Sequence, residues 1–180
     1  TPPATPDEAR ALGMAFDVHA RTRPVRRVAE TRPKYGADGG MLARERIPQL
    51  LAALDAELAE QQLKVDLLMV GGAVMTVVFQ AREQTKDIDA IFDHGSAVRE
   101  AVARIARRED LAEDWLNDAV SGFLSPVGRY DPYFEGASLR VFMARADYLL
   151  AMKILAMRLE AEYRDADDIR FLCRYLGISR

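Results

Sequence analysis

The central stretch of the chain, residues 63–92, reads LKVDLLMVGGAVMTVVFQAREQTKDIDAIF. Its apolar run over residues 63–70 stops at a pair of glycines, which is typical of a buried strand that ends in a tight connection. Residues 73–79 then favour a helix, and the run DIDAIF over residues 87–92 favours a second strand. A strand, a glycine pair, a helix and a second strand in this order predict a mixed α/β unit.

The glycine pair, Gly71-Gly72, is the first candidate for a functional role. Glycine lets a backbone come close to a ligand, and the N–H groups at the start of a helix favour a phosphate. A glycine pair between a strand and a helix can also be a purely structural connection. The pair alone therefore leaves both interpretations open.

The two acids of the second strand, Asp87 and Asp89, are the second candidate. Residues i and i+2 of a strand share a face, so both carboxylates project together while Ile88 points into the core. Two like charges this close repel each other unless a cation or a proton lies between them. Oxygen ligands at this spacing suit Mg²⁺. A half-exposed strand end is the structural alternative, but the glycine pair upstream favours the metal site.

The flanking sequence predicts helices over 47–58, 96–108, 111–124, 147–159 and 165–176, and one or two strands over 133–144. The apolar spacing is least regular over 111–124, where the helix is expected to run into a loop. The predicted fold class is α/β, more narrowly α+β, with a small mixed sheet flanked by helices and with helices at the C-terminal side.

Lys153 lies in the predicted helix over 147–159, whose side chains are apolar nearly all round. Such a helix is buried on most of its surface, and a lysine is rarely buried without a partner. Lys153 therefore either extends its ammonium to the surface or binds a phosphate or a carboxylate. Asp165 and Asp168 are the candidate carboxylates, because both border the apolar face of the next helix while Asp167 points away. Acids favoured by the helix dipole are the structural alternative.

The composition excludes several classes of protein. The 180 residues carry a net charge of −3, which gives no overall electrostatic case for nucleic-acid binding. A single cysteine excludes a disulfide framework and a cysteine-based zinc site within one chain. No apolar run is long enough to span a membrane and no secretory signal is evident, so the reducing cytoplasm is the expected compartment.

Residues 1–40 differ from the rest of the chain, because they are rich in proline and end in GADGG. They contain one weak helical pattern. We expect them to form a flexible or weakly helical N-terminal extension, and residues 41–180 to form the folded domain. A basic arm that contacts RNA or a partner protein is the alternative for the extension.

Two pairs of motifs resemble a known superfamily. Residues 69–73 (MVGGA) and 85–89 (TKDID) resemble the signature of the DNA polymerase β-like nucleotidyltransferase superfamily, whose glycines precede a short helix and Asp-x-Asp. Residues 151–154 (AMKI) and 164–169 (RDADDI) are similar to elements of its small bacterial branch related to AbiEii and MenT toxins. The resemblance implies a nucleotidyltransferase fold for residues 41–180.

The resemblance also implies a role for each matching residue. Gly71 and Gly72 would hold the triphosphate of a nucleoside triphosphate (NTP), Asp87 and Asp89 would ligate Mg²⁺, and Lys153 would offset charge on the phosphates. The carboxylate of Asp168 would complete the site, with that of Asp165 as the second candidate.

One departure from the superfamily concerns a third catalytic carboxylate, which typical members carry on a later strand. Residues 138–143 contain no acid, and Arg140 is their only charged residue. The toxin-like branch also tends to lack this carboxylate. The general base therefore stays unassigned.

The implied reaction moves a nucleoside monophosphate from an NTP to an acceptor hydroxyl and releases pyrophosphate. The toxin-like branch implies RNA as the acceptor, especially a tRNA 3′ end, and a cognate antitoxin as a possible partner. A protein hydroxyl or a small-molecule antibiotic is an alternative acceptor. A catalytically inactive fold kept as a binding or regulatory module is the alternative that the missing carboxylate favours.

Basic residues outside the motifs are candidates for contact with RNA phosphates. They are Arg26, Arg27, Arg104, Arg107 and Arg108. Solvated helix faces explain residues 104–108 equally well.

Overall fold

The computed structural model describes residues 40–120, 128–159 and 163–178, and the side chains of residues 157–165 lie outside that description. The strands are β1 (Leu42–Ala43), β2 (Val65–Met69), β3 (Gln84–Thr85), β4 (Ile88–Phe92), β5 (Leu116–Asn117), β6 (Tyr130–Glu135) and β7 (Leu139–Ala144). The helices are α2 (Arg46–Glu60), α3 (Gly71–Val77), α4 (Gly95–Glu109), α5 (Ala146–Leu159) and α6 (Tyr163–Tyr175). The predicted mixed α/β class is confirmed.

The main sheet of the described residues is mixed and has the strand order β5-β4-β2-β7-β6. Strand β2 pairs with β4 in antiparallel and with β7 in parallel orientation. At the two edges, β5 runs parallel to β4 and β6 runs antiparallel to β7. The successive residues Leu67, Leu68 and Met69 of β2 are all buried, so both faces of this central strand are covered, which explains its nearly continuous apolar run.

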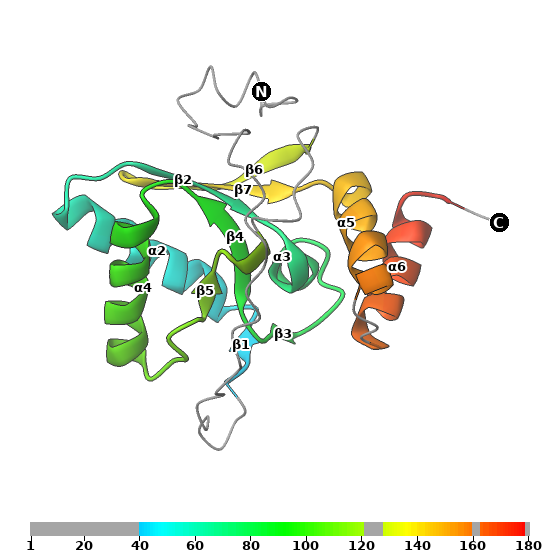
Figure 1. Cartoon of the computed structure of the whole chain (residues 1–180), viewed down its shortest axis with the longest axis horizontal. Coiled ribbons are helices and arrows are strands. Elements are labelled where there is room, and N and C mark those ends of the chain that lie inside the picture. Colours follow the sequence, from blue (N-terminus) through cyan, green and yellow to red (C-terminus); the bar gives the residue numbers. More distant parts are fainter. Residues whose placement is uncertain (1–39, 121–127, 160–162, 179–180) are drawn as a thin grey trace.

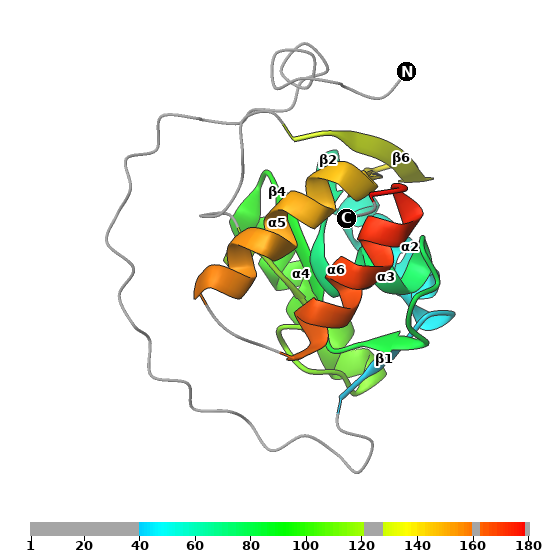
Figure 2. The same cartoon turned by 90° about the vertical axis from the view of Figure 1, so that its right-hand side faces the viewer.

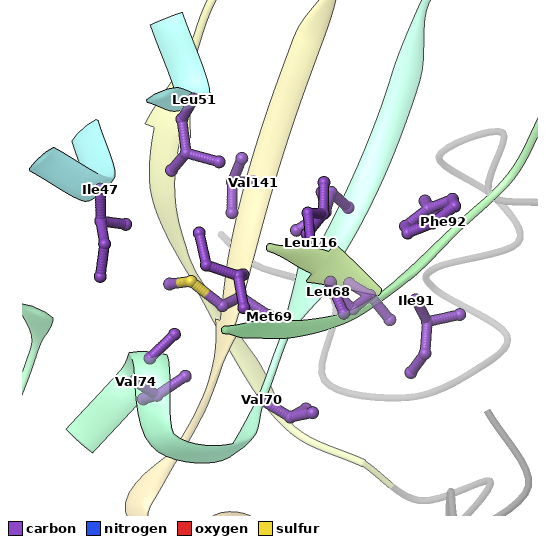
Figure 3. Close-up of a cluster of buried hydrophobic side chains, with 14 of the residues drawn as sticks. Ile47, Leu51, Leu68, Met69, Val70, Val74, Ile91, Phe92, Leu116 and Val141 are labelled. Carbon is purple, nitrogen blue, oxygen red and sulfur yellow. The ribbon is translucent and has the colours of Figure 1, made fainter. Parts of the chain in front are cut away.

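Helices α2 and α4 lie side by side against the sheet (Figure 1). Figure 3 shows Ile47 and Leu51 of α2 directed toward Met69 of β2 and Val141 of β7. All four side chains are buried. Burying one such side chain contributes about 1.5–3 kcal/mol, so the apolar stripe predicted over 47–58 fixes α2 to the sheet.

An ion pair network joins α2 to α4 at the surface. Glu57 of α2 accepts from Nε of Arg104 and from Nη1 of Arg108, both at 2.8 Å. These hydrogen bonds hold the pKa of the Glu57 carboxyl below its ordinary value. The contacts account for Arg104 and Arg108 as structural partners of α2.

Helices α5 and α6 lie side by side at the other end of the molecule, past the end of β7 (Figures 1 and 2). An aromatic contact connects α6 to the end of α3. The ring of Phe79 lies 6.1 Å from that of Phe171 and 5.0 Å from that of Tyr175. Leu172 of α6 is fully buried. The C-terminal helices are thereby fixed next to the helix that begins at the glycine pair.

The predicted helix over 111–124 is wrong in its described part, because residues 116–117 form β5. Its last residues, 121–124, lie outside the described ones. The indole of Trp115 is 1 % exposed and donates from Nε1 to the carbonyl of Val102 at 3.1 Å. The carbonyl of Trp115 accepts from the N–H of Ile88 at 2.8 Å. Anchoring this large side chain on α4 leaves the next residues extended beside β4.

The other boundaries agree with the sequence to within a few residues. Helix α3 already begins at Gly71, and β4 begins at Ile88, so that Asp87 directly precedes the strand. Two strands, β6 and β7, occupy the region over 133–144. The predicted extension lies outside the described residues except for Gly40. Among the helices that the structure describes, none has the length and apolar character to cross a membrane.

Asp55 of α2 is expected to stabilise the turn between β6 and β7. Its carboxylate accepts the N–H groups of Ala137, Ser138 and Leu139 at 3.2, 2.7 and 2.7 Å. We expect Asp55→Ala to lower the free energy of unfolding by about 2–3 kcal/mol, because hydrogen bonds to a charged acceptor are lost. Urea unfolding measures the change. Glu60→Ala, an exposed acid on the same helix, is the control, and equal unfolding midpoints for the two variants would contradict this role.

Candidate functional site

The antiparallel pairing of β2 with β4 brings the glycine pair to the two aspartates. The N–H of Val70 donates to the carbonyl of Asp89 at 2.9 Å. Gly71 follows directly with φ +67°, and a Cβ added to it would lie 2.5 Å from Oδ2 of Asp89. Gly71 therefore meets both conditions that require glycine, a positive φ and a close approach.

The carboxylates of Asp87 and Asp89 interact electrostatically. Burial, followed by the charge of Asp87, raises the pKa of Asp89 to about 6. A hydrogen bond from Asn117 and the charges of Lys153 and Lys86 act in the opposite direction. Ile88, between the two acids, is fully buried. The predicted alternation of one inward apolar side chain between two carboxylates is therefore present.

Asn117 is a site residue that the sequence analysis missed. Strand β5 pairs with β4 in parallel and sets Asn117 opposite Asp89. The side-chain Nδ2 of Asn117 lies 3.5 Å from Oδ2 of Asp87, and its Oδ1 accepts the N–H of Ala119 at 3.1 Å. The second contact orients the amide so that its donor group is directed toward the carboxylates. The apolar pair before Asn117, Trp115-Leu116, was the available signal for a short strand.

Lys153 of α5 and Asp168 of α6 form a buried ion pair. Nζ of Lys153 lies 2.6 Å from Oδ2 of Asp168, and the two residues are 8 % and 3 % exposed. The alternative in which Lys153 extends to the surface is therefore wrong, because a carboxylate inside the fold stabilises its ammonium. Asp167 is exposed and pairs with Arg170 at 2.7 Å, as its predicted outward direction requires. Asp165 belongs to α6, but its side chain lies outside the described ones.

Arg82 is the second site residue that the sequence analysis missed. Its Nε donates to Oδ1 of Asp168 at 3.0 Å, and its Nη2 donates to Oδ2 of the same carboxylate. The guanidinium also borders the glycine pair, because a Cβ on Gly72 would lie 3.5 Å from Nη1 of Arg82. The signal in the sequence for this residue was its position, because an arginine in the short connection between the glycine motif and the aspartate motif must lie near both.

The donor set at Asp87 and Asp89 fits a magnesium ion. The two carboxylates are close enough for one charge to raise the pKa of the other, which is the electrostatic situation that a cation relieves. In the described part of the chain, including this site, no group of three or more His, Cys, Asp or Glu side chains is arranged to hold a metal. Mg²⁺ needs no such group, because it binds one or two carboxylates together with water and substrate phosphates.

The described residues of β7 carry no carboxylate beside this pair. The one charged side chain within Leu139–Ala144, Arg140, is bonded through Nε and Nη2 to Asp66 of β2, both at 2.6 Å. The third catalytic carboxylate, which the sequence lacks over residues 138–143, is therefore also missing from the described residues of β7. The charge of Arg140 is used within the sheet instead.

Gly71→Ala is expected to cost more stability than Gly177→Ala, although both glycines have φ +67°. Alanine at either position costs about 1–2 kcal/mol of backbone strain. At Gly177 nothing lies within 4 Å of the added Cβ, whereas at Gly71 the Cβ meets Asp89. We therefore expect thermal unfolding to show the larger decrease in Tm for Gly71→Ala. Equal decreases would show that Gly71 does not pack against the carboxylate.

Asp89 is expected to make the folded state less stable as the pH rises. Its pKa is about 6 in the folded state against an ordinary value of 3.8, so the folded state binds more protons between these values. Stability therefore falls as the pH rises through this window. Asp89→Asn has no carboxyl to titrate at this position. Without divalent cations, its free energy of unfolding should therefore rise relative to that of the wild type by on the order of 2–3 kcal/mol between about pH 4 and pH 8.

Urea unfolding at a series of pH values measures this gain. The control is Asp167→Asn, which changes an exposed acid and should follow the wild-type curve. Parallel curves for wild type and Asp89→Asn would contradict the raised pKa.

Comparisons with known proteins bear on the family of this chain. No curated protein and no solved structure matches it. The model of a family described as nucleotidyltransferase of unknown function (DUF6036) matches residues 46–172, a range that contains the site from Gly71 to Asp168. The match supports the superfamily that the motifs resemble, while the toxin-like branch stays a prediction. Because the matched range is well over half of the chain, the protein belongs to the DUF6036 nucleotidyltransferases.

Proposed function

We propose that the protein transfers a nucleoside monophosphate from an NTP to an acceptor hydroxyl, with release of pyrophosphate. The observation that carries this proposal is Asp89 held against Gly71, with the charges of Asp87 and Lys153 acting on its carboxyl. A nucleotide substrate follows from the family.

The two carboxylates would hold Mg²⁺ together with the phosphates of the NTP. Bound there, Mg²⁺ would offset the charge that develops on the attacking and leaving oxygens. Phosphoryl-type transfer depends mostly on positioning and electrostatic stabilisation, which side chains fixed on a sheet can supply. The raised pKa of Asp89 supports this use, because a cation at the pair would favour its ionised form.

The glycine pair and Lys153 would bind the triphosphate. Gly71 has no side chain where the backbone meets Asp89, so the glycine pair lies directly beside a carboxylate that would ligate the metal, and phosphates held by that metal would lie near the glycines. Lys153 would bring a positive charge to the phosphates from α5, and its contact with Asp168 at 2.6 Å keeps the ammonium in place. Asp165, also on α6, would be the second candidate for a carboxylate that completes the site.

RNA is the acceptor that we propose first, in particular a tRNA 3′ end. This choice rests on the resemblance to the toxin-like branch, which also suggests a toxin controlled by a cognate antitoxin. A protein hydroxyl or a small-molecule antibiotic is the alternative. Two of the arginines considered for RNA contact, Arg104 and Arg108, already bind Glu57, so they give this choice no support.

A binding or regulatory module without catalysis is the second candidate. The observation in its favour is that β7 carries Arg140, bonded to Asp66, and no acid beside Asp87 and Asp89. Such a module would still bind Mg²⁺ and NTP. Binding without transfer is therefore the result that distinguishes it from the enzyme.

A transfer assay tests the proposal. The wild type is incubated with Mg²⁺, total bacterial tRNA and each of the four α-labelled NTPs in turn. We expect label to enter RNA and the double variant Asp87→Asn/Asp89→Asn to reduce the rate by at least about a hundredfold, because the metal loses its ligands. Asp167→Asn, an exposed acid, is the matched control and should keep the wild-type rate.

Each other outcome has a defined meaning. Label on the protein instead of RNA would keep the reaction and change the acceptor. Binding of Mg²⁺ and NTP without any transfer would support the inactive module. Absence of both transfer and NTP binding would contradict the proposed function.

A further inference from the structure

A cluster of three charged side chains, Arg82, Lys153 and Asp168, lies next to the aspartate pair. Neither the motifs nor the family assigns a role to Arg82. The carboxylate of Asp168, 3 % exposed, accepts hydrogen bonds from Arg82 on both oxygens and contacts Nζ of Lys153 at 2.6 Å. Arg82 comes from the connection between α3 and β3, Lys153 from α5 and Asp168 from α6. Three separate segments of the chain therefore meet at one buried carboxylate.

The two cations extend from Asp168 toward different halves of the site. Nη1 of Arg82 lies beside Gly72, 3.5 Å from the position of an added Cβ. Lys153 lies close enough to Asp89 for its charge to lower the pKa of that carboxyl. Arg82 therefore borders the glycine pair, and Lys153 borders the metal-binding aspartates.

The contacts of Asp168 argue against its use as a metal ligand or a general base. Both of its oxygens already accept hydrogen bonds from cations. A carboxylate held by a two-point contact to a guanidinium is fixed in direction as well as in charge. Such a carboxylate orients the groups that bind it.

We infer that Arg82 is a substrate-binding residue that contacts the phosphate tail of the NTP over Gly71 and Gly72, and that Asp168 is the positioning residue that holds Arg82 and Lys153 for this contact. The inference rests on the proposed function for the identity of the ligand. It extends that function by assigning Arg82 and by giving Asp168 a role other than catalysis. A planar guanidinium suits this task, because its donors match phosphate oxygens in a way that a lysine ammonium does not.

Binding measurements with two probes test the inference. Each of the four NTPs and inorganic tripolyphosphate are titrated in the presence of Mg²⁺ into wild type and into Arg82→Lys, which keeps the charge and loses the planar donor fork. Tripolyphosphate carries the phosphate tail without a base or ribose. We expect Arg82→Lys to raise Kd for both probes by about tenfold, since one charge-assisted contact is lost.

Asp168→Asn should raise Kd for both probes to a similar extent, because its amide cannot accept from both cations. The matched control is Asp167→Asn, the neighbouring exposed acid, which should leave both Kd values unchanged. Thermal unfolding is recorded for every variant, and Arg82→Gln replaces Arg82→Lys if the latter does not fold. In the transfer assay, the Arg82 variant should show a raised KM for NTP and a smaller change in kcat.

The outcomes separate this inference from the proposed function. Wild-type binding of both probes by a folded Arg82→Lys would overturn the inference and leave the transferase proposal intact. Weaker NTP binding with unchanged tripolyphosphate binding would also overturn it, because Arg82 would then act on the nucleoside part. If wild type binds neither probe, both proposals fail together.

Discussion

The hydrogen bonding between the end of β2 and the start of β4 is the constraint on which the site depends. The bond from Val70 N–H to the Asp89 carbonyl, at 2.9 Å, holds the glycine pair and the aspartate pair side by side. Glycine at position 71 follows from this register, because a Cβ there would meet the Asp89 carboxylate. A shift of one residue in β4 would exchange Asp89 with its buried neighbours and place carboxylates in the core.

Burial gives this arrangement its electrostatic character. Removing Asp89 from water raises its pKa, and the charge of Asp87 raises it further. One of the opposing charges, that of Lys153, comes from α5, far along the chain, while Arg82 borders the glycine pair from the connection after α3. Asp168 fixes both cations from α6. The C-terminal helices, which lie at one edge of the molecule in Figure 1, are therefore part of the site.

The sequence predicts the parts of this structure that depend on local periodicity. The strand over 63–70, the following helix and the paired direction of Asp87 and Asp89 can be read from alternation and from the glycines, because these are properties of neighbouring residues. The parts that depend on distant contacts could not be predicted in this way. Residues 111–124 show a weakly helical pattern, and only the burial of Trp115 on α4 makes β5 and so brings in Asn117.

Lys153 and Arg82 show the same limit. The sequence left open whether Lys153 reaches the surface, because the answer depends on Asp168, a residue of the next helix. Only its place between the glycine and aspartate motifs marks Arg82 in the sequence, because its partner Asp168 lies 86 positions away. That separation also leads us to expect an order of assembly. The aspartates and glycines belong to adjoining strands that can pair early, whereas closing a long loop costs more entropy and is slower. A partly folded chain could therefore present the acidic half of the site without the cationic half, so that nucleotide capture would begin only when folding is complete.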